Sequence, residues 1–356
     1  MPPDSTHRHR DVESAPGDGA FLRAFAATFA GLALGLAAIV RLTDPLGAFG
    51  TGILPPVVSA DRDYKASLYR SAARRPEVIV LGSSRVKALR PACITDLTGH
   101  ASFNFGVNAG VAEDFVAILR FVRSDSTGAV REILLGADPE AFTGETGAGR
   151  ALQASRMLGR HAPVPLATAS LSNPSAADYL TLESVGAAFR SLGRALVPAR
   201  ELPQDALAAD GWQTHPRWDA ELAAGTFPHA ERIASSVASV GARYRRSLEL
   251  SPARIALLER FLQEARAGGL RVTAFIPPVH PDLTASRAAT SLGAMTAAMD
   301  SVLRDAERRG LVRYIGAERL TADPAHFYDA VHMMARNGDA VLAAIYGDRG
   351  AACAVQ

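Results

Sequence analysis

The chain has 356 residues, of which 48% are hydrophobic and 21% are charged, and its formal net charge is +2. This composition is typical of a folded protein, because disordered chains are poorer in apolar residues and carry more net charge. The near-neutral charge and the lack of a basic stripe with interleaved aromatic residues argue against a nucleic-acid-binding protein.

The N-terminal part of the chain divides into a polar and an apolar segment. Residues 1–20 are polar and rich in Pro and Gly, so they are predicted to be a disordered cytoplasmic tail. Residues 24–40 contain no charge between Arg23 and Arg41, and such a run can just span a bilayer if the arginines snorkel. We predict an uncleaved signal anchor over residues 21–42. A cleaved signal peptide, for which no clean small-x-small site follows, and a buried core helix are the alternatives.

Basic residues are distributed unequally around this apolar run. Arg8, Arg10 and Arg23 precede it, whereas Arg41 is the only basic residue shortly after it. Because basic flanks tend to stay in the cytoplasm, the expected product is a single-pass protein of the inner (cytoplasmic) membrane. Its globular part is expected to be periplasmic or extracellular.

Residues 60–347 alternate between short apolar runs and helical patterns, which predicts a doubly wound, flavodoxin-like α/β domain with a parallel sheet. The predicted strands cover residues 78–82, 101–105, 132–136, 272–276 and 312–315. The predicted helices include residues 182–196, 252–267, 292–308 and 337–346. Residues 140–250 break the alternation with Gly, Pro and Ser clusters, so they are predicted to form an insertion or lid, or a loosely helical surface layer.

Two motifs near opposite ends of this domain carry groups suited to chemistry. The first strand runs into Ser83 and Ser84, at the carboxyl edge where open α/β sheets bind ligands. Asp329 and His332 lie three positions apart, just before the last helix. A hydroxyl, an imidazole and a carboxylate are the nucleophile, base and orienting group of acyl transfer. A helix N-cap and an idle surface pair are the plainer structural alternatives.

These motifs resemble those of the SGNH, or GDSL-type, hydrolases. In that family the nucleophilic Ser follows Gly-Asp at the end of the first strand, and an Asp-x-x-His near the C-terminus completes the triad. The resemblance implies that Ser84 is the nucleophile, with Ser83 in place of the Asp, and that Asp329 and His332 are the orienter and the base. Gly106 resembles the glycine of the second block, whose N–H helps to form the oxyanion hole.

The third block of the family, Gly-x-Asn-Asp, is altered in this chain. The third strand ends at Gly136 and continues into Asp138, so no Asn is present to donate to the oxyanion. An ionised Asp138 cannot donate, and the hole is therefore expected to depend on N–H groups of Ser84, Gly106 and Asn108. The Gly-Ser-Ser turn resembles the cell-envelope branch of the superfamily, which includes proteins that help to acylate teichoic acids or exopolysaccharides beside membrane-bound acyltransferases.

Two functions are compatible with these motifs. The first is a membrane-anchored serine O-acyl esterase or O-acyltransferase that acts on a cell-surface glycan or an acylated small substrate, without a cofactor. The second is a catalytically inactive SGNH-like domain that binds a glycan or a membrane-bound acyltransferase. The retained triad favours the first function, and the altered third block favours the second.

Arg85 and His280 are further candidates for substrate contact. Arg85 directly follows Ser84, and it is expected either to contact an anionic group or to cap the sheet edge. His280 follows a strand and could line the same crevice. A metal site built from His280, His326 and His332 is not expected, because no pair has the helical His-x-x-x-His spacing.

The only two cysteines are Cys93 and Cys353, and they do not have the spacing of metal ligands. In an oxidising compartment they could form a disulfide. Because Cys353 lies in a segment predicted to be frayed, we expect two unpaired thiols instead.

Overall fold

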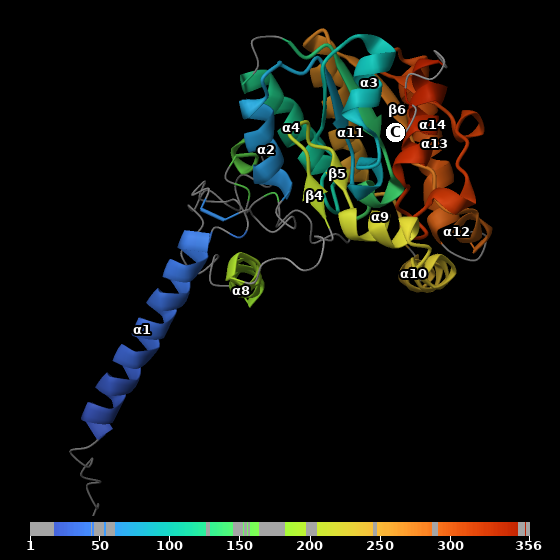
Figure 1. Cartoon of the computed structure of the whole chain (residues 1–356). Coiled ribbons are helices and arrows are strands. Elements are labelled where there is room, and N and C mark those ends of the chain that lie inside the picture. Colours follow the sequence, from blue (N-terminus) through green and yellow to red (C-terminus); the bar gives the residue numbers. More distant parts are fainter. Residues whose placement is uncertain are drawn as a thin grey trace, which may run out of the picture.

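The computed structural model describes residues 18–43, 45, 53–54, 61–125, 129–144, 152, 155, 157–163, 182–196, 205–244, 248–286, 291–347 and 353. Helix α1 (Asp18–Thr43) extends away from an α/β domain, which begins with helix α2 (Asp61–Ser71) (Figure 1). Residues 1–17 of the predicted tail lie outside the described residues, whereas residues 18–20 already belong to α1.

The domain is built on one sheet of five parallel strands in the order β2-β1-β3-β6-β7. Counted alone in chain order, these strands run 2-1-3-4-5, which is the doubly wound, flavodoxin-like order. The strands are β1 (Val78–Leu81), β2 (Ser102–Asn104), β3 (Glu132–Gly136), β6 (Arg271–Phe275) and β7 (Arg313–Ile315). The predicted fold class is confirmed, and each predicted strand end lies within one residue of the observed end.

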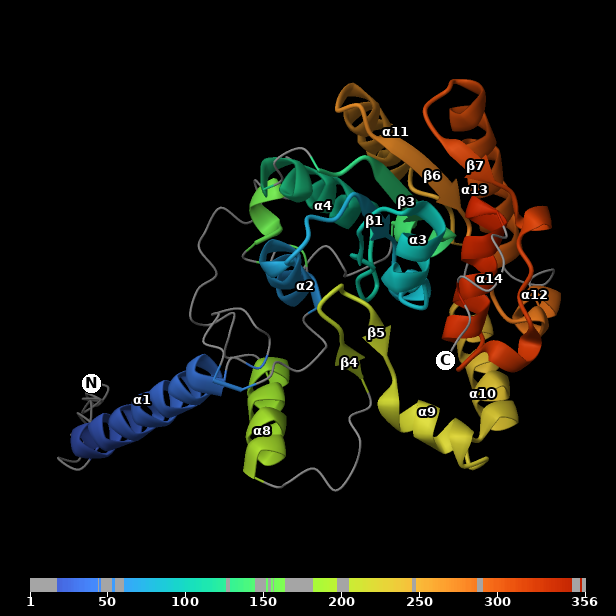
Figure 2. The same cartoon turned by 45° about the horizontal axis from the view of Figure 1, so that its top comes forward.

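Helices cover both faces of this sheet, because the strand side chains alternate between them. Ile79, Leu81 and Ile133 point to the face covered by α2, α4, α11 and α13, whereas Val80 and Leu134 point to the face covered by α3 and α14. α3 and α14 lie side by side in Figure 2. The covering helices are α3 (Pro91–Thr98), α4 (Ala112–Asp125), α11 (Pro252–Ala267), α13 (Ser291–Arg308) and α14 (Ala335–Tyr346), with the short α12 (Pro281–Ser286) between β6 and α13.

The described residues between β3 and α11 add no strand to the five-stranded sheet. They form α8 (Leu182–Leu196), β4 (Ala206–Leu207), β5 (Gln213–Thr214), α9 (Pro216–Ala223) and α10 (His229–Tyr244). β4 and β5 make a small antiparallel hairpin. Asp210 lies in the turn between them, and its carbonyl accepts the N–H of Asn104 at the end of β2. Short 3-10 helices also occur: η2 (Ser84–Val86), η3 (Pro139–Phe142), η4 (Gly159–His161), η6 (Ala317–Arg319) and η7 (Pro324–His326).

Helix α1 is long and apolar enough to cross a membrane. Its 26 residues give a length of about 39 Å, compared with about 30 Å for the hydrocarbon core of a bilayer. Its most apolar window has a mean hydropathy of 1.9, and only 6% of that window is buried. Large side chains such as Phe25, Phe29 and Leu34 are exposed. This exposure contradicts the alternative of a core helix and fits an anchor or a signal sequence.

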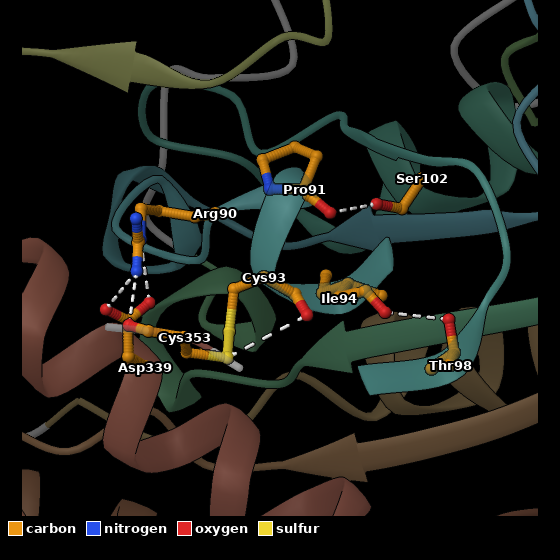
Figure 3. The surroundings of a disulfide bond; sticks show 8 residues. All are labelled: Arg90, Pro91, Cys93, Ile94, Thr98, Ser102, Asp339 and Cys353. Carbon is orange, nitrogen blue, oxygen red and sulfur yellow. Dashed lines mark hydrogen bonds and ion pairs between the residues drawn. A yellow bond between two sulfur atoms is a disulfide. The ribbon is translucent and has the colours of Figure 1, made fainter. Parts of the chain in front are cut away.

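Cys93 in α3 and Cys353 form a disulfide with a Cα–Cα distance of 5.0 Å (Figure 3). The prediction of two unpaired thiols is therefore wrong. α14 carries the chain back to α3, where the guanidinium of Arg90 donates to both carboxylate oxygens of Asp339 (2.9 and 2.7 Å) and to the Cys353 carbonyl (2.7 Å). A structural disulfide is typical of an oxidising compartment and is consistent with an extracytoplasmic domain.

Candidate active site

The turn after β1 presents one serine and buries the other. Gly82 has φ 156°, and a Cβ at this position would lie 2.7 Å from Cγ1 of Val86, so a side chain here would strain the backbone and crowd Val86. Ser83 is buried and caps η2, since its Oγ accepts the N–H of Arg85 at 3.3 Å. Ser84 is partly exposed. The N-cap interpretation thus applies to Ser83 and leaves the hydroxyl of Ser84 available.

Ser84 lies within hydrogen-bond distance of a histidine that is itself paired with a carboxylate. Oγ of Ser84 is 2.9 Å from Nε2 of His332, and Nδ1 of His332 is 2.7 Å from Oδ2 of Asp329. The imidazole is about one-third exposed, with 35% of its side chain accessible, so a substrate can reach it. The structure therefore brings together the three side chains that the two distant motifs supply.

Asp329 is held as an ionised orienter. Its other oxygen, Oδ1, accepts the N–H groups of Val331 and His332, each at 2.9 Å. Burial acts to raise the pKa of Asp329, but the hydrogen bonds from His332 and from these backbone groups outweigh it and lower the pKa to about 2. A carboxylate that stays charged near neutral pH can keep the proton of His332 on Nδ1 and leave Nε2 free to face Ser84.

The segment before Asp329 is held by hydrogen bonds to helices α9 and α10. The Tyr328 hydroxyl donates to Asp219 of α9 at 2.5 Å, and its carbonyl accepts Nε of Arg232 of α10 at 3.2 Å. His229 of α10 lies 2.8 Å from the Phe327 carbonyl. These positioning residues could not be identified from the sequence, because contacts between residues about 100 positions apart leave no local motif.

The second block has a different hydrogen-bond pattern from the expected one. The N–H of Gly106 donates to Oδ1 of Asn104 at 2.8 Å, and the N–H of Asn108 donates to Oδ2 of Asp61 at 2.5 Å. Neither N–H is therefore free to bind an oxyanion in this conformation. Within the described residues, the N–H groups of Ser84 and Ala109 have no acceptor.

Ala109 occupies an unusual backbone conformation next to the nucleophile turn. Its φ is 46°, the only positive φ at a non-glycine among the described residues. It lies in a turn closed by the N–H of Gly110 and the carbonyl of Val107 at 3.2 Å. A Cβ on Gly110 would lie 2.9 Å from the Gly82 carbonyl oxygen and 3.2 Å from Cα of Ser83, so this turn packs directly on the serine turn.

Asp138 follows β3 at the position where the family has Asn. It is 1% exposed, and neither carboxyl oxygen has a hydrogen-bond partner with good geometry among the described residues. Burial raises the pKa of Asp138 and Glu140 adds to the rise, although Arg85 and the Ser83 hydroxyl oppose it. Its burial therefore shifts Asp138 towards the neutral acid, relative to an exposed carboxyl group.

Arg85 and His280 are both buried. The Arg85 side chain is 3% exposed and its guanidinium pairs with Glu140. The His280 side chain is 9% exposed, and its ring packs edge-on against Phe327 with centroids 5.6 Å apart. The N–H of His280 donates to the Ala330 carbonyl at 2.9 Å. Through these contacts, Arg85 supports the turn that carries Ser84, and His280 supports the segment that carries Asp329 and His332. Among the described residues, no group of three or more His, Cys, Asp or Glu is arranged to hold a metal.

A cavity of about 610 Å³ lies elsewhere, at the amino edge of the sheet. It is lined by residues at the starts of β3, β6 and β7, among them Glu132, Arg271 and Arg313. The serine turn follows the carboxyl end of β1, so this cavity is separate from Ser84.

No family model matches this chain, and no curated protein matches it.

Proposed function

We propose that this chain is a membrane-anchored serine O-acyl esterase or O-acyltransferase acting on a cell-envelope glycan, related to the SGNH hydrolases that its motifs resemble. The observation that carries the proposal is the unbroken relay from Ser84 to His332 to Asp329, with distances of 2.9 and 2.7 Å. A nucleophile, a base and an orienter in this order are the geometric signature of acyl transfer.

The relay supports a two-step reaction. Nε2 of His332 takes the proton of Ser84 as Oγ forms a bond to the acyl carbon, and Asp329 stabilises the resulting imidazolium. The bond to the leaving alkoxide then breaks, and the alkoxide takes the proton from His332. The acyl-serine ester is resolved when water or a sugar hydroxyl attacks the acyl carbon, with His332 again accepting the proton. The bond from the acyl carbon to Oγ of Ser84 then breaks, and Oγ takes the proton back from His332. Water gives hydrolysis, and the sugar hydroxyl gives transfer.

The negative charge that develops on the acyl oxygen needs donors close to Ser84. We assign this role to the N–H groups of Ser84 and Ala109, which have no acceptor among the described residues. This assignment replaces Gly106 and the N–H of Asn108, which donate to Asn104 and Asp61. Packing of Gly110 on Gly82 and Ser83 places the two donors in neighbouring turns.

The class of substrate follows from the location and from the resemblance. α1 is apolar and exposed, and the disulfide is consistent with an extracytoplasmic domain. A domain tethered in this way meets the polymers of the cell envelope. The resemblance of the Gly-Ser-Ser turn to envelope acylation proteins adds O-acyl groups on glycans as the substrate, and a membrane-bound acyltransferase as the partner.

A catalytically inactive binding domain is the second candidate. The observation that favours it is Asp138, a carboxyl group where the family has an Asn that donates to the oxyanion. Such a domain would bind the glycan or the acyltransferase without forming an acyl-serine.

Labelling with a fluorophosphonate probe separates the two candidates, because the probe reacts with an activated serine. The membrane-anchored protein is expected to be labelled, and Ser84→Ala is expected to abolish labelling while leaving the thermal unfolding midpoint unchanged. Absence of labelling in the wild type, together with no turnover of small acyl esters, would contradict the enzyme and support the binding domain.

A further inference from the structure

The first turn of α2 buries charged side chains against the second block. Asp61 and Lys65 are fully buried, and Arg62 and Asp63 are 6% exposed. Burial of charges is costly unless each is paired, so an arrangement of this kind needs specific partners. Asp61 pairs with Lys87 and accepts the N–H of Asn108, and Lys65 donates to two carbonyls in the segment that leads to the turn at Ala109. Asp63 has its partners in a different segment.

Asp61 holds Asn108 directly, by a hydrogen bond, and indirectly, through Lys87. Its Oδ2 accepts the backbone N–H of Asn108 at 2.5 Å and Nζ of Lys87 at 2.8 Å. The same Nζ of Lys87 donates to the side-chain Oδ1 of Asn108 at 2.7 Å. Backbone and side chain of Asn108 are therefore fixed by one ion pair, whose members come from α2 and from the residue that follows η2.

Lys65 fixes the residues just before this turn. Its Nζ donates to the carbonyls of Asn104 and Gly106, at 2.9 and 2.6 Å. Burial, followed by repulsion from Lys87, lowers the pKa of Lys65 well below its usual range. The pKa of Asp61 is lowered despite its burial, chiefly by Lys87, so the ion pair stays charged.

From this geometry we infer that Asp61 is a positioning residue for the oxyanion hole, acting through Asn108 on the N–H of Ala109. Asn108 can act on the N–H of Ala109 because the two residues are joined by a peptide bond. The N–H of Ala109 belongs to the peptide unit that follows Asn108, so fixing the N–H and side chain of Asn108 fixes the Cα–C bond from which that unit starts. Rotation about this bond is then limited by the hydrogen bond from the N–H of Gly110 to the carbonyl of Val107, which closes the turn. The inference rests on the proposed function. It adds that α2 shapes the site, and it explains how Ala109 is kept at a φ of 46°.

Asp63 offers a matched control on the same helix. It is also a buried carboxylate that accepts one hydroxyl and one backbone N–H, from Ser155 at 2.5 Å and from Met157 at 2.9 Å. Neither of these partners belongs to the second block. Asp61→Asn and Asp63→Asn therefore remove the same charge two positions apart in the first turn of α2, and Asp61 is the one that is hydrogen-bonded to Asn108.

The experiment measures kcat and KM on a small acyl ester, the rate constant of fluorophosphonate labelling, and the thermal unfolding midpoint. Asp61→Asn is expected to lower kcat and the labelling rate about tenfold or more with KM changed less than about twofold, approaching the loss seen when an oxyanion donor is removed. Asp63→Asn is expected to keep kcat within about threefold of wild type at a comparable loss of thermal stability. Asn108→Ala, in a partly exposed turn, is expected to give a smaller fall in kcat and serves if Asp61→Asn does not fold.

Three results would contradict the inference. They are wild-type rates in Asp61→Asn, equal falls in kcat in the two Asp variants, or wild-type rates in Asn108→Ala when Asp61→Asn is unfolded. If the proposed function is wrong, the result is different, because the wild type itself would then be unlabelled and inactive. That result would also contradict the role of Asp61.

Discussion

The hydroxyl of Ser84 lies 2.9 Å from Nε2 of His332, although the two residues are 248 positions apart in the chain. Ser84 follows β1, which lies next to the edge strand β2, and His332 lies between β7, at the opposite edge of the sheet, and α14. Their contact therefore exists only when the whole sheet is assembled.

The orienter and the base should act as one unit. His332→Ala is expected to lower turnover by several orders of magnitude, because an unassisted serine is a poor nucleophile near neutral pH. Asp329→Asn is expected to cost a comparable or smaller factor, since the imidazole then adopts the wrong tautomer. Steady-state kinetics of the double mutant should give a loss close to that of His332→Ala alone. Additive losses would show that the two residues work independently.

The two serines of the turn should separate function from stability. Ser84→Ala is expected to abolish ester turnover without destabilising the fold, because Ser84 does not cap η2. Ser83→Ala is expected to keep much of the turnover and to lower the free energy of unfolding by about 1 kcal/mol, since its Oγ caps η2. Turnover and chemical denaturation of both variants test this. Equal loss of turnover in the two folded variants would mean that the nucleophile has been misassigned.

The disulfide should contribute strongly to stability. It closes a loop of 260 residues, and a native disulfide typically adds about 2–5 kcal/mol. Cys353→Ala is expected to lower the thermal unfolding midpoint and to leave Arg90 and Asp339 paired. Addition of a reductant should lower the midpoint of the wild type and have no effect on the variant. A wild type that is insensitive to the reductant, with two thiols that react in the native state, would contradict the bond.

Asp138 should make stability depend on pH. Its pKa is raised in the folded state, so the folded protein holds a proton that the unfolded chain releases at about pH 4. Its stabilising effect is therefore complete below that pH and is lost as pH rises towards the folded pKa. Asp138→Asn is expected to be more stable than the wild type at about pH 8 and not at about pH 4. Urea unfolding at the two pH values tests this, and an unchanged difference would contradict it.

The proposed anchor predicts the topology of the protein. A reporter fused after Gln356 is expected to be active only when it lies outside the cytoplasm, because Arg8, Arg10 and Arg23 favour a cytoplasmic N-terminus. Alkaline carbonate should not release the protein from membranes, since α1 exposes its apolar side chains along its length. Cytoplasmic reporter activity with a soluble product would overturn both the anchor and the compartment.

Local patterns were sufficient to predict the sheet, because β1, β3 and β6 are short, mostly apolar runs, and all five strands alternate with helical patterns. They also identified Ser84, Asp329 and His332, since both halves of the relay lie in short motifs. The partners of the second block could not be predicted. Asp61 and Asn108 meet across 47 positions, and no spacing indicates such a contact. The disulfide was missed for the same reason, because Cys353 reaches α3 only through the packing of α14.

The disulfide also determines whether the fragments of this protein stay together after proteolytic cleavage. Ser84 precedes Cys93, and His332 precedes Cys353, so a cut at any peptide bond between Cys93 and His332 puts the serine and the histidine on different fragments. The cross-link between Cys93 and Cys353 would keep these fragments together. A clipped molecule would therefore migrate as a single species without reductant and as two with it, and it could retain both members of the relay in one particle.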